Sequence, residues 1–227
     1  MIRLADIVFS IVILILAIPL LIVVGLAIRL ASPGPVLYLA ERAGRGNEPF
    51  RMFKFRSMHV DSGGSEITAT NDQRVFAVGR IVRALKLDEL PQFFNVIRGD
   101  MAIVGPRPEA PAIVAKHYNP WMMETLDIRP GITSPGAIFY YAYGDDLLSS
   151  DDPETAYADK LLAPKLALDL AYAQRATLWS NIVVVMHTAL SIVAKALGKS
   201  IGPQKRDINA STQWVSNTAL MRGETTS

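Results

Sequence analysis

The chain lacks cysteine, and this absence removes whole classes of chemistry. None of its 227 residues is a cysteine, so the sequence contains no disulfide framework, thiolate nucleophile or cysteine-based zinc site. Histidine is scarce as well, and His59, His117 and His187 show no metal-ligand spacing. The formal net charge is only +2, so composition offers no general argument for nucleic-acid binding. An electrostatic site must therefore come from local clustering of charges.

Hydrophobic residues, by contrast, make up 50% of the chain, and the longest apolar run lies near its beginning. The run between Asp6 and Arg29 has about the 20 residues that span a bilayer as a helix. A signal peptide would have a shorter apolar region and a cleavage site. Pro19 lies near the middle of the run, where it predicts a kink or break. The helix then either turns back or crosses the membrane, and these residues alone support a spanning helix at least as well.

A β-hairpin is expected next, with strands at residues 36–39 and 50–58 joined by the turn-rich segment 44–47. Lys54 and Arg56 are two residues apart, so we expect them on one face of the second strand, which is typical either of a solvated face or of a phosphate site. Basic residues follow the apolar run and predict a cytoplasmic domain. They are Arg42, Arg45, Arg51, Lys54 and Arg56.

Two amphipathic helices are expected at residues 75–85 and 90–99, from apolar residues at helical spacing. Asp88 and Glu89 would lie at the start of the second helix. One interpretation makes Asp88 an N-cap and leaves Glu89 to interact with the helix dipole. The other places both carboxylates in a phosphoryl site formed by the helix N-terminus and basic side chains. Those side chains are Lys54, Arg56, Arg80 and Arg83.

Two further motifs favour the phosphoryl site. Residues 99–108 end in Pro106-Arg107-Pro108, which presents a guanidinium from a stiff loop at little entropic cost. Residues 129–133 read RPGIT. With KFRSM, LDELPQFFNVIRGDM and VGPRP, they resemble, over roughly residues 1–133, the signature segments of the bacterial sugar transferases, the monotopic phosphoglycosyl transferases.

This resemblance implies transfer of a sugar 1-phosphate from a UDP-sugar to polyprenyl (undecaprenyl) phosphate, the first membrane step of glycan assembly. A carboxylate would attack the sugar-bearing phosphorus, release UMP and form a covalent aspartyl-phosphosugar intermediate. By matching position, Asp88 is the nucleophile and a ligand of Mg²⁺, and Glu89 is its acidic partner. The matching substrate-binding residues are Arg42, Lys54, Arg83, Arg107, Pro108 and Arg129.

The resemblance also implies a re-entrant membrane helix broken at Pro19, although Ile18 stands where many relatives have serine. After RPGIT the chain reads SPGAIFYY, where many relatives continue differently, so their sugar specificity is not transferred.

The C-terminal third predicts a further amphipathic helix. Its apolar stripe could pack on the core or lie at the membrane interface, and we expect it to pack on the core. The stripe comprises Trp179, Ile182, Val183, Met186, Leu190, Val193 and Leu197. Residues 199–227 are expected to be flexible or a surface arm.

The sequence as a whole predicts an α+β fold, mainly helical, with amphipathic helices at the membrane interface. We expect a membrane helix at residues 1–30 and a catalytic domain at 31–198 on the cytoplasmic face of the bacterial inner membrane. A C-terminal tail at residues 199–227 follows. The expected partners are a UDP-sugar, polyprenyl phosphate and the lipid bilayer, with a homodimer left open. A non-catalytic membrane scaffold and a Mg²⁺-dependent phosphohydrolase are the alternative functions.

Overall fold

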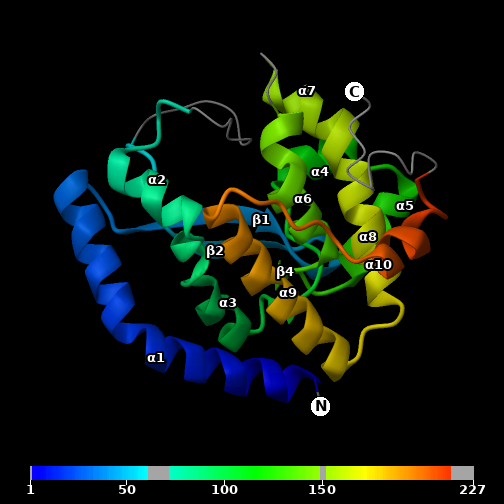
Figure 1. Ribbon diagram of the computed structural model, residues 1–227, viewed down its shortest axis with the longest axis horizontal. Coiled ribbons are helices and arrows are strands. Elements are labelled where there is room, and N and C mark those ends of the chain that lie inside the picture. The colour runs from blue at the N-terminus through cyan, green and yellow to red at the C-terminus, as the bar shows by residue number, and fades with distance from the viewer. Residues whose placement is uncertain (1, 61–71, 149–151, 216–227) are drawn as a thin grey trace.

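The computed structural model describes residues 2–60, 72–148 and 152–215, which form a mainly helical α+β structure (Figure 1). Helix α1 (Ile2–Ala31) precedes a hairpin of strands β1 (Leu37–Ala43) and β2 (Pro49–Phe55). The remaining elements are α2 (Ala77–Ala84), α3 (Gln92–Arg98), β3 (Ala102–Val104), α4 (Pro111–His117), α5 (Pro120–Met123), β4 (Gly131–Thr133), α6 (Pro135–Leu147), α7 (Pro153–Tyr157), α8 (Ala163–Ala173), α9 (Leu178–Ala196) and α10 (Lys205–Ser211). The aperiodic, glycine- and serine-containing sequence of residues 61–72 predicts a loop, of which residues 61–71 lie outside the described residues.

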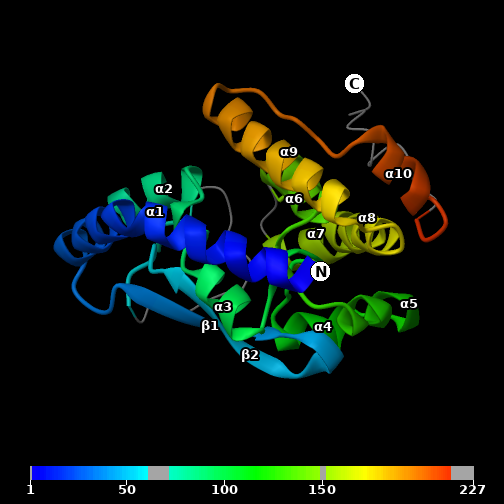
Figure 2. The ribbon, with the colours of Figure 1, turned by 90° about the horizontal axis from the view of Figure 1, so that it is seen from below.

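Helix α1 is continuous from Ile2 to Ala31 but bends sharply part-way along its length (Figure 1). Pro19 lies inside the helix, and an interior proline removes one backbone hydrogen bond and kinks a helix. Seen from below, α1 crosses the molecule with the hairpin on one side and α9 on the other (Figure 2). The helix is thus bent without being interrupted.

The two halves of α1 pack on different parts of the molecule. Near its start, the Phe9 ring lies 6.4 Å from that of Phe93 in α3, and Arg3 donates a hydrogen bond of 2.5 Å to the Val96 carbonyl. Near its end, Val24 and Ile28 are buried in a cluster with Phe55, Phe76 and Val82. Both halves are therefore held against the body of the protein.

The outer face of α1 is apolar and exposed, with Leu16 73% and Leu30 87% accessible. Its length and composition are sufficient to cross a membrane, as are those of α9. Exposed apolar surface this extensive is rare on soluble monomers, which seldom show apolar patches larger than a few hundred Å². The chain is a membrane-associated protein.

The hairpin forms as expected, but its second strand ends before Arg56. The register pairs Leu37 with Phe55 and Tyr38 with Lys54. Arg56 is buried and donates hydrogen bonds of 2.6 Å to the carbonyls of Ser32 and Pro35. The prediction that Arg56 shares a phosphate-binding face with Lys54 is therefore wrong. Arg56 instead ties the hairpin to the end of α1.

A short parallel pair, β3 and β4, was not expected from the sequence. Ala102 pairs with Gly131 and Val104 with Thr133, so the Pro-Arg-Pro loop and the RPGIT segment begin side by side. Gly105 and Gly131 approach so closely that a Cβ atom on Gly131 would overlap the backbone of Gly105. Glycine is required here because the two backbones leave no room for a side chain.

The largest core cluster lies between α6 and α8, with contributions from α4, α5, α10 and the π-helical turn Ala158–Leu162. Phe139, Leu161, Leu166 and Leu168 are all fully buried in it. This cluster packs against α6, the helix that carries Tyr140, Tyr141 and Tyr143.

Helix α9 forms as expected and begins with a capping box of Thr177 and Ser180, but its orientation corrects the prediction. Asn181, Val184, Ser191 and Ala194 form its buried face. The predicted apolar stripe faces outward, with Trp179 72% exposed and Leu190 57% exposed. The face of α9 that packs on the protein consists mainly of small and polar residues. Its apolar stripe therefore adds to the exposed apolar surface of α1.

The C-terminal segment is more ordered than expected. Residues 205–211 form helix α10, which packs against α8 and buries Ile208 in the main core. This part of the expected tail is therefore a helix packed on α8. Residues 216–227 lie outside the described residues.

We predict that Gly131→Ala lowers the free energy of unfolding by about 1–3 kcal/mol, because the added methyl group would overpack the contact with Gly105. The matched control is Gly144→Ala in α6, where the new Cβ atom would meet only the Tyr140 ring at 3.4 Å. That change should be neutral, or stabilising by up to about 1 kcal/mol. Thermal unfolding of the detergent-solubilised protein measures both, and equal effects would contradict the close-approach argument.

Candidate active site

One cavity of about 640 Å³ lies where the hairpin, α2, the Pro-Arg-Pro loop, α6, α8 and α9 meet. Basic side chains outnumber acidic ones along its wall. Five of the six predicted substrate-binding residues line it, together with Asp88 and Glu89. These five are Arg42, Lys54, Arg83, Arg107 and Pro108.

Asp88 lies in a 3-10 turn, Leu87–Glu89, between α2 and α3. It is only 3% exposed, and its Oδ2 is 3.0 Å from Lys54 Nζ. Its Oδ1 is buried and has no hydrogen-bond partner among the described residues. Because α3 begins only at Gln92, with Pro91 at its N-cap position, the N-cap interpretation of Asp88 is wrong.

An unpaired buried carboxylate oxygen is costly in a folded protein. Such atoms are rare in native structures and call for a ligand, ion or water. Asp88 Oδ1 therefore marks the place in the cavity where a further group is expected.

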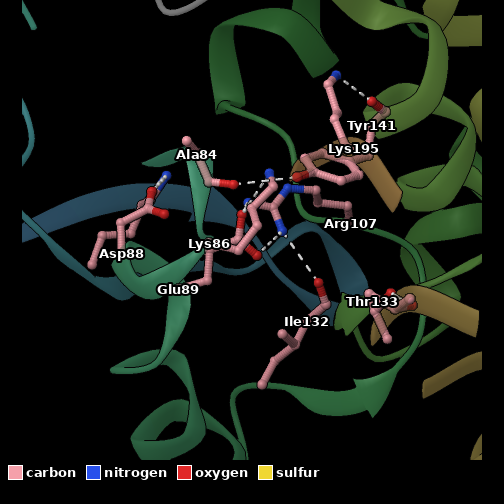
Figure 3. Close-up of polar contacts among 11 residues, drawn as sticks. Ala84, Lys86, Asp88, Glu89, Arg107, Ile132, Thr133, Tyr141 and Lys195 are labelled. Atoms are coloured by element: carbon pink, nitrogen blue, oxygen red, sulfur yellow. Dashed lines mark hydrogen bonds and ion pairs between the residues drawn. The ribbon is translucent and has the colours of Figure 1, made fainter. Parts of the chain in front are cut away.

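Glu89 extends in a different direction and forms a bidentate ion pair with Arg107 (Figure 3). Its Oε1 and Oε2 accept hydrogen bonds of 2.8 and 3.1 Å from the guanidinium, and Lys86 Nζ lies 3.3 Å from Oε1. Burial opposes ionisation of Glu89, but the charges of Arg107, Lys86 and Lys54 outweigh it and hold its pKa well below the usual range. Glu89 is thus an anion paired with two cations, Arg107 and Lys86.

Burial and neighbouring charges also shift the pKa of Lys54, the cation beside Asp88. Burial lowers the pKa of Lys54, and the charges of Asp88 and Glu89 oppose that shift. Lys54 reaches Asp88 from β2, a strand 34 positions earlier in the chain. The charge pair that positions the candidate nucleophile is therefore a tertiary contact.

Arg129 lies outside this cavity as the structure describes it. Its charge acts on Arg3 and Asp6 of α1, and its backbone carbonyl contacts Gly105. Arg129 thus interacts electrostatically with the start of α1. Its expected role in substrate binding stays a prediction.

The cavity also contains charged residues that the sequence did not single out. Glu109 follows the Pro-Arg-Pro tripeptide and is buried in an ion pair with Lys165 of α8 and a hydrogen bond from Tyr157. Tyr141 lies between two cations, with Lys86 Nζ 4.8 Å and Lys195 Nζ 4.7 Å from its ring centre. Proximity to Pro108 could have marked Glu109, but no local pattern marked Lys165 or Lys195.

Asp169 of α8 is a second buried acid near the same loop. It accepts a 2.8 Å hydrogen bond from the Gly136 backbone at the start of α6. Burial raises the pKa of Asp169 to about 7, while Ser134, the Gly136 N–H and the Arg107 backbone act in the opposite direction. Asp169 thus connects α8 to the segment that carries Arg107.

Comparison with known proteins identifies the family. The model of the family described as bacterial sugar transferase matches residues 1–195. The chain belongs to the bacterial sugar transferase family.

Curated relatives support this assignment. The chain is 36% identical, over 192 residues, to the UDP-N-acetylgalactosamine-undecaprenyl-phosphate N-acetylgalactosaminephosphotransferase of Aeromonas hydrophila, a match covering 83% of this chain and 42% of that protein. It is 36% identical to the UDP-glucose:undecaprenyl-phosphate glucose-1-phosphate transferase of Caulobacter vibrioides, covering 84% and 69%. The Escherichia coli protein of the same name is 35% identical, covering 82% and 39%. The chain therefore spans less than half the length of two of these three relatives.

The bacterial sugar transferase chain offers few protein ligands for a metal ion. Within the described residues, no group of three histidine, aspartate or glutamate side chains could hold a metal. Glu89 is engaged by Arg107 and Lys86, which leaves Asp88 Oδ1 as the oxygen available at this place. One carboxylate plus substrate phosphates is a common way of binding Mg²⁺. The site therefore fits a cation that arrives with a phosphate substrate.

We predict that Asp169→Asn stabilises the protein at high pH. An acid whose folded pKa is raised to about 7 opposes folding as pH rises above its unfolded value, and the penalty is complete above about pH 7. The midpoint difference between variant and native protein should grow from pH 5 to pH 8, corresponding to a few kcal/mol at most. Thermal unfolding across this range is the measurement, and a constant difference would contradict it.

Proposed function

We propose that this chain transfers a sugar 1-phosphate from a UDP-sugar to polyprenyl (undecaprenyl) phosphate, with Asp88 as the covalent nucleophile and UMP as the released product. The main support for this proposal is the Asp88 carboxylate. It is buried in the wall of a cavity rich in basic side chains, and one of its oxygens has no hydrogen-bond partner among the described residues. The printed names of the relatives describe transfer of glucose or N-acetylgalactosamine phosphates to undecaprenyl phosphate. Because those sugars differ, the sugar remains to be determined.

The cavity suits a nucleotide sugar in size and charge. Its volume of about 640 Å³ lies within the roughly 300–1,000 Å³ typical of small-molecule sites. Arg42, Arg80 and Arg83 line it in addition to the cations around Asp88 and Glu89. Arginine is well suited to phosphate because its planar fork donates two parallel hydrogen bonds.

In the first step, Asp88 Oδ1 would attack the sugar-bearing phosphorus. The new Asp88 O–P bond forms as the P–O bond to UMP breaks, and UMP leaves with the bonding electrons. Lys54 holds the other carboxylate oxygen at 3.0 Å, so the side chain has little freedom left to lose on reaction. The surrounding guanidinium groups would stabilise charge on the phosphoryl oxygens.

We further propose Mg²⁺ as the cofactor, bound by Asp88 and the diphosphate. When bound, the cation would offset the repulsion between an anionic nucleophile and an anionic substrate. The observation that supports this is again the unpaired Asp88 Oδ1.

In the second step, a phosphate oxygen of the polyprenyl phosphate would attack the same phosphorus. Its O–P bond forms while the Asp88 O–P bond breaks, which regenerates the carboxylate and leaves a polyprenyl-diphosphate-linked sugar. The acceptor is a lipid, so the reaction must occur where the exposed apolar faces of α1 and α9 meet the bilayer. We propose that this is the cytoplasmic face of the bacterial inner membrane, at the start of glycan assembly.

We predict that Asp88→Asn reduces UMP formation by more than about a thousandfold, because the amide cannot act as the nucleophile. A panel of UDP-sugars, assayed for UMP with and without Mg²⁺ in membranes, measures this and identifies the donor. Asp127→Asn, on an exposed side chain of the turn Glu124–Asp127, is the matched control and should retain activity.

Other outcomes would distinguish the alternatives. A phosphohydrolase would release free sugar phosphate without lipid, and a scaffold would turn over no nucleotide. A phosphosugar adduct found by mass spectrometry on a residue other than Asp88 would refute the assigned nucleophile.

We also propose that α1 is re-entrant, so that both its ends lie on the cytoplasmic side. Its bend and its packing at both ends against one protein body support this (Figure 1). The absence of native cysteine permits single-cysteine labelling. Neither Ile2→Cys nor Lys116→Cys should react with an impermeant maleimide in intact spheroplasts, and both should react after permeabilisation. Labelling of Ile2→Cys alone in intact spheroplasts would show a spanning helix.

A further inference from the structure

A second, smaller cavity adjoins the first. It measures about 190 Å³ and is lined mainly by apolar side chains of α3, β4, α6 and α9. We call it the apolar groove, defined by Leu90, Phe93, Ile132, Ala137, Ile138 and Ile192. Its volume is below the roughly 300 Å³ at which small-molecule sites begin, so it does not suit a nucleotide sugar.

The threonine and serine hydroxyl groups on the groove wall already form hydrogen bonds within the protein. The Oγ1 atoms of Thr133 and Thr188 lie 2.7 Å apart in a hydrogen bond. Thr188 also donates to the Val184 carbonyl, and Ser191 donates to the His187 carbonyl, both at 2.9 Å. The wall therefore has few hydroxyl donors to offer a sugar or base, and an apolar occupant fits it best.

The groove and the main cavity share one wall. Lys86, Glu89, Arg107, Tyr140 and Tyr141 line both of them. A molecule with an apolar chain in the groove would therefore place its head group beside Arg107 and Lys86, next to the cavity that holds Asp88. Arg107 and Lys86 share the single anion Glu89 there, so one net positive charge is left to complement an anionic head group.

The other walls of the groove belong to elements that reach the apolar outer surface. Phe93 of α3 packs on Phe9 of the membrane helix α1. Ile192 lies on α9, whose opposite face exposes Met186, Leu190 and Val193. An occupant would thus lie close to lipid along much of its length.

We infer that the apolar groove binds the first isoprene units of the polyprenyl phosphate acceptor, with its phosphate held by Arg107 and Lys86. This inference rests on the proposed function and assigns the acceptor its own site, separate from that of the donor. The remaining isoprene units stay in the bilayer. Donor and acceptor then reach the Asp88 phosphorus from two cavities, across the wall that contains the Glu89–Arg107 pair.

The test separates the two half-reactions. Ala137→Leu and Ile192→Phe fill the groove from two different helices, and we expect each to raise the acceptor KM by about tenfold or more. The burst of UMP from UDP-sugar without lipid should stay close to that of the native protein. Leu190→Phe, on the exposed face of α9, is the matched control and should change neither quantity.

The choice of acceptor distinguishes the groove from the membrane. The two groove variants should raise the KM for undecaprenyl phosphate and for the short, water-soluble geranyl phosphate by similar factors. Both acceptors would place their first isoprene units in the groove. Acceptor KM values that stay native in both variants, with a normal UMP burst, would overturn the inference. No UMP burst in the native protein would instead refute the proposed function.

A measurement on the native chain covers the case in which both variants fail to fold. A prenyl phosphate that carries a photoreactive diazirine near its phosphate end should cross-link to peptides containing Phe93, Ala137 or Ile192. Cross-links confined to α1 would overturn the inference.

Discussion

The bidentate ion pair between Glu89 and Arg107 is the interaction on which the arrangement of the site depends. It joins the turn after α2 to the loop after β3 and forms part of the wall between the two cavities. Burying two charges is costly, and the cost is offset only when the hydrogen-bonding groups are well satisfied. Here Lys86 supports Glu89, and the Ile132 carbonyl accepts a 3.2 Å hydrogen bond from Arg107. The pair therefore positions both the carboxylate turn and the cationic loop.

The second constraint is that the two longest helices direct apolar faces outward. Helix α9 buries Asn181 and Ser191 while Trp179 is exposed. Helix α1 likewise buries Asp6 and Ser10 while Leu16 is exposed. This pattern is the reverse of that of a helix packed on a soluble core. Lipid on that side would remove the apolar faces from water, and it would hold a prenyl acceptor close to the groove.

Much of the local structure could be predicted from the sequence. Period-two and helical spacings predicted the hairpin, α2, α3 and α9, because these signals lie within one element. Some basic residues of the cavity were also found, since Arg83 and Arg107 belong to recognisable segments, whereas Lys165 and Lys195 were not. Arg56 was misplaced, because its side chain hydrogen-bonds to the end of α1. A motif indicates which residues matter to a family, whereas the direction of each side chain depends on what packs around it.

The long apolar N-terminal helix, the residue types of the charged site and the family could all be recognised from the sequence. Which charges meet is set by tertiary packing. Lys54 reaches Asp88, Arg107 reaches Glu89 and Lys165 reaches Glu109 from distant segments. Those contacts depend on the packing of β2 on the turn Leu87–Glu89, the pairing of β3 with β4 and the packing of α6 on α8. Such non-local pairings depend on the closure of long loops and the filling of a shared core, and no periodicity within a single element encodes them.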